Sequence, residues 1–250
     1  TDTHPKHLAA RIELPDGRVT IGAMAKGSGM IHPNMATMLA FLTTDASIPS
    51  KTLRTLLKSA VDQSFNRISI DGDTSTSDTV LLLANGASGY SCDRGHARQA
   101  FSEALEQIAT DLAKMIVLDG EGVSKLISIH VSGARKPTDA HRVANTIATS
   151  PLVKTAFAGS DPNWGRIMAA AGRAGVTLDP QLTELWIDAD DYTPILLVAC
   201  GARCSYRESE ARQIFASSNF TVHLDLGHGK AETTVLTGDL THEYVTINSD

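Results

Sequence analysis

The sequence lacks the excess of basic residues that binding to nucleic acids or anionic membranes requires. Its 250 residues include 22 Lys and Arg against 28 Asp and Glu, which gives a net charge of −6. Phosphate backbones and anionic headgroups attract a positively charged protein face. No apolar run approaches the roughly 20 residues that a membrane-spanning helix needs. We therefore expect neither a nucleic-acid partner nor a membrane partner.

Cysteine is also scarce. Cys92, Cys200 and Cys204 are odd in number and show no Cys-x-x-Cys spacing. This pattern favours neither a disulfide framework nor a zinc site. Small buried side chains in a reducing cytoplasm are the interpretation that fits best.

The common motifs of cofactor and catalytic sites are missing as well. No G-x-G-x-x-G follows a predicted strand, Gly227-x-Gly229-Lys230 is not a Walker A loop, and no G-x-S-x-G elbow occurs. The histidines are scattered without an H-E-x-x-H pattern, and His223 alternates with leucines as on a half-exposed strand. We therefore expect no metal site and no bound cofactor.

The residues that are present are typical of a globular protein, with 42% apolar and 20% charged residues. Strands are predicted at residues 18–25, 37–44, 67–70, 79–84, 125–131, 184–188, 194–199, 219–226, 230–237 and 243–248. Helices are predicted around 53–61 and 101–115, through an alanine-rich stretch at 138–174, and at 207–217. Strands and helices mix without a regular βαβ rhythm, which favours the α+β class. The polar segment 133–139 predicts a boundary between domains 1–135 and 136–250.

The segment from Lys26 to Asp45 suggests a nucleophile. A glycine-containing basic loop, Lys26-Gly-Ser-Gly-Met30, precedes an Ala36–Thr37 bond and a strongly apolar run. Cleavage of that bond would make Thr37 N-terminal and place its hydroxyl beside its own α-amino group. Such an amine titrates near neutrality and can accept the hydroxyl proton. The alternative is that Thr37 is only a β-branched residue of a buried strand.

Three other polar segments each allow more than one interpretation. The loop Asp71–Asp78 could bind Ca²⁺ or Mg²⁺ through oxygen ligands, form a tight polar turn, or pack in part against an active site. Glu121 stands between two glycines after a helix, where it could meet a cationic ligand group or remain solvated. The segment 159–166 could begin an anion-binding helix, or an N-capped helix anchored by Trp164.

Taken in order, these segments resemble one enzyme family. The matching stretches are Lys26-Gly-Ser-Gly-Met30, Pro33-Asn-Met-Ala-Thr-Met-Leu-Ala-Phe-Leu-Thr-Thr-Asp-Ala46, Asn66-Arg-Ile-Ser-Ile-Asp-Gly-Asp-Thr-Ser-Thr-Ser-Asp-Thr79, Asp119-Gly-Glu-Gly-Val-Ser-Lys125, Asp161-Pro-Asn-Trp-Gly-Arg166 and Tyr244-Val-Thr-Ile-Asn248. They span nearly the whole chain and resemble the glutamate N-acetyltransferase/ornithine acetyltransferase family of arginine biosynthesis.

This resemblance implies a proenzyme that cuts itself between Ala36 and Thr37 into α and β chains. Thr37 would then be the nucleophile of a ping-pong cycle, with its own amine as base. It would take acetyl from N-acetylornithine, and in bifunctional members also from acetyl-CoA as co-substrate, and pass it to glutamate. Lys26, Glu121 and Asn248 match the family's substrate-contacting positions, together with Thr37.

The family fold implies part of a four-layer αββα sandwich with a smaller C-terminal α/β domain. It also implies a cytoplasmic heterotetramer of two α and two β chains. The family's Thr-Gly oxyanion hole has no counterpart here, so the remaining α-chain residues are expected to supply it. The chain opens at Thr1-Asp-Thr3, inside a family Thr-Thr-Asp-Thr run, and is expected to be a piece of a longer protein.

Two other functions stay open at this point. A related N-terminal-nucleophile aminopeptidase would use water as acceptor, although its nucleophile is typically Ser. An uncleaved homologue would bind amino acids without catalysis.

Overall fold

The computed structural model describes residues 1–32 and 38–249. The chain forms two compact units, Thr1–Ile68 with Gly72–Gly120 and Ser69–Asp71 with Glu121–Asp250. Residues 121–135 thus lie with the second unit, whereas the polar segment at 133–139 predicts a boundary after residue 135.

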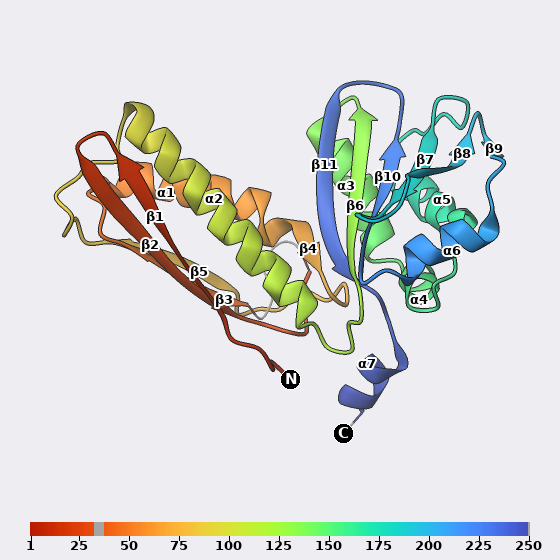
Figure 1. The fold of residues 1–250 in the computed structure, drawn as a ribbon, viewed down its shortest axis with the longest axis horizontal. Coiled ribbons are helices and arrows are strands. Elements are labelled where there is room, and N and C mark those ends of the chain that lie inside the picture. Colours follow the sequence, from red (N-terminus) through yellow and green to blue (C-terminus); the bar gives the residue numbers. More distant parts are fainter. Residues whose placement is uncertain (33–37, 250) are drawn as a thin grey trace. The chain divides into compact units, whose positions relative to one another are not determined.

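The first unit is a four-stranded sheet with two helices on one face (Figure 1). The strand order is β1-β2-β3-β5, antiparallel except for the parallel pair β3 and β5. Helix α2 packs on β1 and β2, and α1 packs on α2 and β5. The elements are β1 (Lys6–Leu14), β2 (Gly17–Lys26), β3 (Leu39–Thr44), α1 (Ser50–Gln63), the 3-10 helix η1 (Phe65–Arg67), β5 (Thr79–Ala84) and α2 (Gly95–Leu118).

Helix α2 owes its position to one apolar stripe. Phe101, Leu105, Ile108 and Leu112 recur at helical spacing, and all four side chains are buried, as the sequence predicts. Each such side chain contributes about 1.5–3 kcal/mol when it leaves water. This stripe fixes the face of the helix that meets the sheet.

Strand β1 is an element that the sequence predictions miss. It pairs antiparallel with β2, and Leu14 lies opposite Gly17 across the Pro15-Asp16 turn. Pro at the first and Asp at the second central turn position, followed by Gly, is a turn signal with a physical basis, because Pro presets the φ angle that this position of the turn needs. The hairpin was therefore identifiable from residues 14–17.

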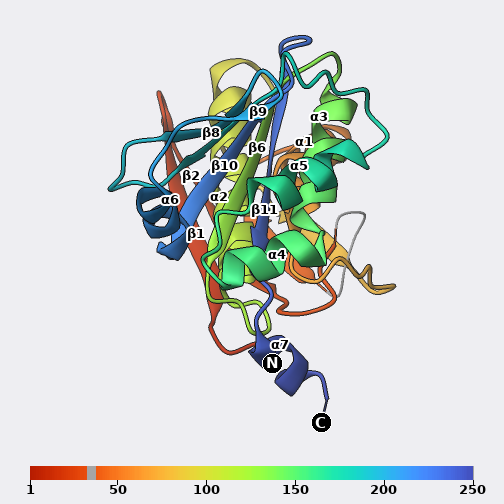
Figure 2. The same ribbon diagram turned by 90° about the vertical axis from the view of Figure 1, so that its right-hand side faces the viewer.

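The second unit is a seven-stranded mixed sheet with the order β4-β11-β6-β10-β7-β8-β9. Helix α3 packs on β6 and β11, and α4 and α5 pack beside it (Figure 2). The elements are β4 (Ile68–Ser69), β6 (Leu126–Ala134), α3 (Pro137–Ala148), α4 (Pro151–Ala158), α5 (Trp164–Gly172), β7 (Glu184–Asp188), β8 (Ile195–Ala199), β9 (Ala202–Arg203), α6 (Glu208–Ala216), β10 (Asn219–Asp225), β11 (Ala231–Gly238) and α7 (His242–Ile247). The mixture of strands and helices confirms the predicted α+β class.

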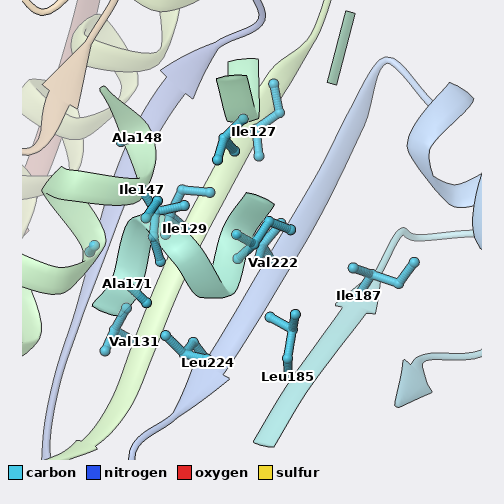
Figure 3. Packing of buried hydrophobic residues seen from close by; sticks show 14 of the residues in the cluster. Ile127, Ile129, Val131, Ile147, Ala148, Ala171, Leu185, Ile187, Val222 and Leu224 are labelled. Atoms are coloured by element: carbon cyan, nitrogen blue, oxygen red, sulfur yellow. The ribbon is translucent and has the colours of Figure 1, made fainter. Parts of the chain in front are cut away.

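The core of this unit lies between the sheet and its helices (Figure 3). Alternate residues of β6, β10 and β7 point to the same face, because side chains alternate along a strand. They meet small and branched residues of α3 and α5, and alanines there let the helices approach closely. The wholly buried residues labelled in Figure 3 are Ile127, Ile129, Val131, Ile147, Ala148, Ala171, Leu185, Ile187, Val222 and Leu224.

The predicted helical stretch 138–174 is helical and consists of three helices, because Pro151 begins α4 and Pro162 precedes α5, and proline cannot continue a helix. One prediction is wrong in this unit. Residues 243–248 do not form a strand but belong largely to α7. The Thr241 hydroxyl accepts a hydrogen bond from Glu243 N at 3.2 Å and caps this helix. Six residues with weak alternation are too few to distinguish the two structures.

None of the helices in residues 1–32 and 38–249 is long and apolar enough to cross a membrane.

Lys125 joins two helices of the second unit through a buried ammonium group. Its Nζ donates to the carbonyl oxygens of Phe157 at 2.6 Å and Phe215 at 2.8 Å, near the C-terminal ends of α4 and α6. It also donates to Ser160 Oγ at 2.8 Å. A cation is favourable at helix C-termini, where carbonyl groups lack intrahelical partners. Burial lowers the pKa of Lys125, and the nearby charge of Asp239 opposes this shift.

Replacing Lys125→Met should lower the free energy of unfolding of the second unit by about 2–4 kcal/mol, since three acceptors lose a charged donor. Urea denaturation followed by tryptophan fluorescence would measure it, because Trp164 and Trp186 both lie in this unit. Lys230→Met removes an exposed lysine and should change the value by less than about 0.5 kcal/mol. Equal stability of the two variants would contradict a capping role for Lys125.

Candidate functional site

Lys26 ends β2 beside the start of β3. In the antiparallel ladder Lys26 lies opposite Leu39, which is two residues after Thr37 in the sequence. The Lys26 side chain is exposed and therefore accessible to a ligand. Ala36 and Thr37, the predicted cleavage residues, lie outside the described residues.

The loop that follows Lys26 is held by the first residues of the chain. Gly27 N donates to Asp2 Oδ2 at 2.8 Å, and the hydroxyls of Thr1 and Ser28 are 2.8 Å apart. Gly27 and Ser28 are buried, whereas Lys26 is exposed. These contacts hold the chain at Gly27 and Ser28, directly beside the exposed Lys26.

A buried lysine links the same chain start to the end of α2. The Lys6 side chain is 1% exposed, and its Nζ lies 2.6 Å from Asp2 Oδ1 and 2.5 Å from Asp119 Oδ2. Burial opposes ionisation of Asp119, but hydrogen bonds from Lys6 and from residues 3–4 outweigh it and hold the pKa of this carboxyl well below its usual range. Asp119 is therefore charged at neutral pH. Sequence reasoning missed Asp2 and Lys6, because a lysine that begins a strand is normally exposed.

In the second unit the structure brings together two of the predicted site residues. Asn248 Nδ2 donates to Glu121 Oε2 at 2.9 Å, although 127 residues separate them in the sequence. The same amide nitrogen lies 3.0 Å from the carbonyl oxygen of Tyr244. Glu121 is half-buried and Asn248 is exposed, so the pair remains accessible.

Gly122 explains why α7 can approach this turn. Its φ is +66°, and a Cβ at this position would lie 2.4 Å from Tyr244 N, too close for any side chain. The Thr241 hydroxyl donates to Gly122 O at 2.7 Å. Thr241 and Asn248 thus attach both ends of α7 to Glu121 and Gly122.

The residues after this turn are anchored independently. Asp239 accepts hydrogen bonds from Ser124 N at 2.7 Å, Ser124 Oγ at 2.5 Å and Lys125 N at 3.0 Å. A carboxylate that accepts three hydrogen bonds holds the chain firmly at the start of β6. Glu121 therefore projects from a rigid support.

The other polar segments behave as structural features. In the loop 71–78, Ser77 N donates to Ser75 Oγ at 3.2 Å, as in a polar turn. Among the described residues no group of three or more His, Cys, Asp or Glu side chains is placed to hold a metal ion. Asn163 Oδ1 accepts from Arg166 N at 3.2 Å, and Trp164 packs against the core, which confirms the N-capped helix.

Comparison with known proteins settles the family. The model of the ArgJ family matches residues 1–250, the whole chain. The chain belongs to the ArgJ family. This confirms the resemblance that the sequence motifs indicate.

Similar members of this family occur in distantly related organisms. The arginine biosynthesis bifunctional protein ArgJ of Symbiobacterium thermophilum is 46% identical over 251 residues, which cover 99% of this chain and 61% of that protein. The Staphylococcus aureus protein of the same name is 45% identical, with 100% of this chain and 60% of that protein covered. A mitochondrial ArgJ of Schizosaccharomyces pombe is 44% identical, with 100% and 57% covered. The chain thus spans about six-tenths of the length of these ArgJ proteins.

A solved ArgJ structure has the same fold. The arginine biosynthesis bifunctional protein ArgJ of Bacillus halodurans aligns with a TM-score of 0.78 and 35% identity. The alignment covers 84% of this chain and 97% of that chain.

The close approach of Gly122 to α7 predicts a selective effect of Gly122→Ala. The added Cβ would push Tyr244 away and break the Asn248–Glu121 hydrogen bond, so chymotrypsin should release the peptide after Tyr244 about 10-fold faster. Mass spectrometry of that peptide measures the rate. Gly175→Ala is the matched control, because Gly175 also has a positive φ of +70° but its nearest atom would be 3.9 Å away. Equal release from both variants would refute the proposed tight fit.

Proposed function

We propose that the complete protein transfers an acetyl group from N-acetylornithine to glutamate through acetyl-Thr37, after self-cleavage between Ala36 and Thr37. The observation that carries this proposal is the hydrogen bond between Glu121 and Asn248, two residues that the family resemblance independently assigns to the substrate site. Membership of the ArgJ family supports it further.

The charges of the candidate residues suit an amino-acid substrate. Glu121 offers a half-buried carboxylate that can bind an ammonium group, and Asn248 leaves its amide oxygen as a further acceptor. Lys26 offers an exposed ammonium that can bind a carboxylate. N-acetylornithine and glutamate both carry an α-carboxylate for Lys26. The ammonium for Glu121 is on the side chain of N-acetylornithine, whose α-nitrogen is acylated, and on the α-carbon of glutamate.

Self-cleavage would begin when the Thr37 hydroxyl oxygen attacks the Ala36 carbonyl carbon. The peptide C–N bond breaks, and the nitrogen takes up a proton as the hydroxyl loses one. Water then hydrolyses the resulting ester, which leaves a carboxylate on Ala36 and a free amine on Thr37. That amine can serve as the base of the mature enzyme.

Acetyl transfer would repeat the same chemistry with a different carbonyl. The Thr37 oxygen attacks the acetyl carbonyl of N-acetylornithine, its α-amine accepts the hydroxyl proton, and ornithine leaves with a proton on its nitrogen. The amine of glutamate then attacks the acetyl ester, and Thr37 recovers its proton. One acetyl group moves in each cycle, and no cofactor is required.

The complete assembly would contain two α and two β chains in the cytoplasm, and the remaining α-chain residues would supply the oxyanion hole. The relatives are named bifunctional proteins of arginine biosynthesis, which supports acetyl-CoA as a second donor. The length beyond this chain in those relatives leaves room for the additional α-chain residues.

The self-cleavage step predicts that Thr37→Ala abolishes chain separation. The precursor should remain one folded chain, because the attacking hydroxyl is lost. Denaturing electrophoresis and N-terminal sequencing of the complete protein measure the result. Thr43→Ala, an exposed threonine of β3, is the matched control and should be cleaved normally. Efficient cleavage of the Thr37→Ala precursor would contradict a self-catalysed cut.

The acetyl-transfer step predicts a modified nucleophile. With N-acetylornithine and no glutamate, peptide mass spectrometry should find an acetyl group on Thr37, and glutamate should remove it. An acetyl group lost equally fast without glutamate would instead indicate a hydrolase. An uncut chain that binds amino acids and never carries acetyl would indicate a binding protein.

A further inference from the structure

Residues 237–241, which we call the connector, join the end of β11 to α7 and hold the turn at residues 121–125. Asp239 accepts three hydrogen bonds from the end of this turn. The Thr241 hydroxyl donates to the carbonyl oxygen of its second residue, Gly122, at 2.7 Å. The positions of the turn and of the start of α7 therefore both depend on where the connector lies.

Two further connector residues are closely packed. A Cβ at Gly238 would lie 2.3 Å from Cγ2 of Val123, too close for any side chain, so glycine lets the connector meet the turn. Thr237 is wholly buried, and its hydroxyl donates to Ala148 O at 2.9 Å, at the end of α3. The connector thus contacts the turn through Gly238 and a helix of the core through Thr237.

A buried lysine of α4 binds the same connector. Lys154 is 3% exposed, and its Nζ donates to Thr237 Oγ1 at 2.9 Å and to the carbonyl oxygen of Gly238. The backbone carbonyl oxygen of Lys154 accepts a hydrogen bond from Leu240 N at 3.2 Å. One residue therefore holds three of the five connector residues, through its side chain and its backbone together.

The ammonium group of Lys154 is retained at a cost in stability. Burial lowers the pKa of Lys154 to about 8, while the charges of Asp239 and Asp71 oppose the shift. The group is therefore protonated at neutral pH, although the folded protein binds this proton less tightly than the unfolded chain does. Methionine would fill a similar space without that cost, but it would leave Gly238 O without its charged donor.

We propose that Lys154 is a positioning residue for substrate binding, acting through the connector on Glu121 and Asn248. This inference rests on the proposed function, in which these two residues bind the substrate. Loss of the Lys154 hydrogen bonds would let the connector move, and with it Asp239, the turn and the start of α7. Glu121 projects from the turn and Asn248 follows α7, so the 2.9 Å contact between Asn248 Nδ2 and Glu121 Oε2 would no longer be fixed.

The kinetics of Lys154→Met in the complete protein test this role. The KM for N-acetylornithine should rise about 10-fold, the effect of losing one hydrogen bond to a charged group. The value of kcat should stay within about 3-fold, because the lysine acts on substrate binding and not on the reacting atoms. Lys154→Gln keeps a neutral donor on a shorter side chain and should raise KM only about 3-fold. If Lys154→Met does not fold, Lys154→Gln decides.

Leu197→Ala is the matched control for loss of stability. Leu197 is wholly buried in β8, which is separated from β11 by β6, β10 and β7. Its truncation should lower the thermal unfolding midpoint of the same unit, because it leaves a cavity in the core. The KM of this variant should nevertheless stay within about 2-fold of the original value.

Hydrogen exchange of the same proteins, followed by mass spectrometry, tests the connector without any catalysis. In Lys154→Met the amides of residues 122–125 and 242–248 should exchange about 10-fold faster, whereas those of β7 should keep nearly their original rates. Leu197→Ala should instead act most strongly on β7, the strand beside β8.

A double variant shows whether the effect passes through the Glu121–Asn248 pair. In Asn248→Ala the amide that meets Glu121 is already absent, so adding Lys154→Met should raise KM by less than about 3-fold more. A full further 10-fold rise would contradict the proposed route through the pair.

Unchanged exchange at residues 122–125 and 242–248 in Lys154→Met would overturn this inference, as would equal acceleration in every peptide or faster local exchange with an unchanged KM. Each of these results would leave the proposed function intact. An unaltered complete protein that transfers no acetyl group from N-acetylornithine would overturn the proposed function and the role of Lys154 in substrate binding with it.

Discussion

The candidate site of the second unit depends on Gly122, because glycine has no side chain. Any Cβ there would enter the backbone of Tyr244, so only glycine lets α7 lie against the turn. The Thr241 and Asn248 contacts follow from that approach, and they are what place an amide beside the Glu121 carboxylate. Helix α7 has no buried residue of its own. Its position therefore comes from these polar contacts and not from a hydrophobic core.

Two buried lysines support the chain on either side of Glu121, each within its own unit. Lys6 neutralises Asp119 with a direct ion pair, whereas Lys125 binds helix carbonyls. Burying an ammonium group is costly unless its donors are satisfied. In both cases they are satisfied by named partners. The stretch from Asp119 to Lys125 is thus rigid at its ends and presents its one accessible carboxylate in between.

Local patterns predicted most of the fold. The bounds of β5 and β7 coincide with the predicted strands, and the stripe of α2 is the predicted one, because burial on one face imposes a period that the residues reveal. Helix α7 was mistaken for a strand because six residues with weak alternation do not distinguish the two structures. Its cap residue Thr241 also binds Gly122 O, a contact that the local sequence does not reveal. The Glu121–Asn248 pair could not be found from spacing at all, since 127 residues separate its members. It came only from the family resemblance. The nucleophile role of Thr37 was suggested by the Ala36–Thr37 segment itself and strengthened by the resemblance, and it stays a prediction.

The most direct test of the proposed double displacement is isotope exchange in the complete protein without glutamate. Incubation with unlabelled N-acetylornithine and labelled ornithine should move label into N-acetylornithine, because an acetyl-Thr37 intermediate lets ornithine leave and another molecule take its place. The exchange should vanish in Thr37→Ala. Absence of exchange in a cleaved protein that still acetylates glutamate would show direct transfer between the substrates and contradict the covalent mechanism.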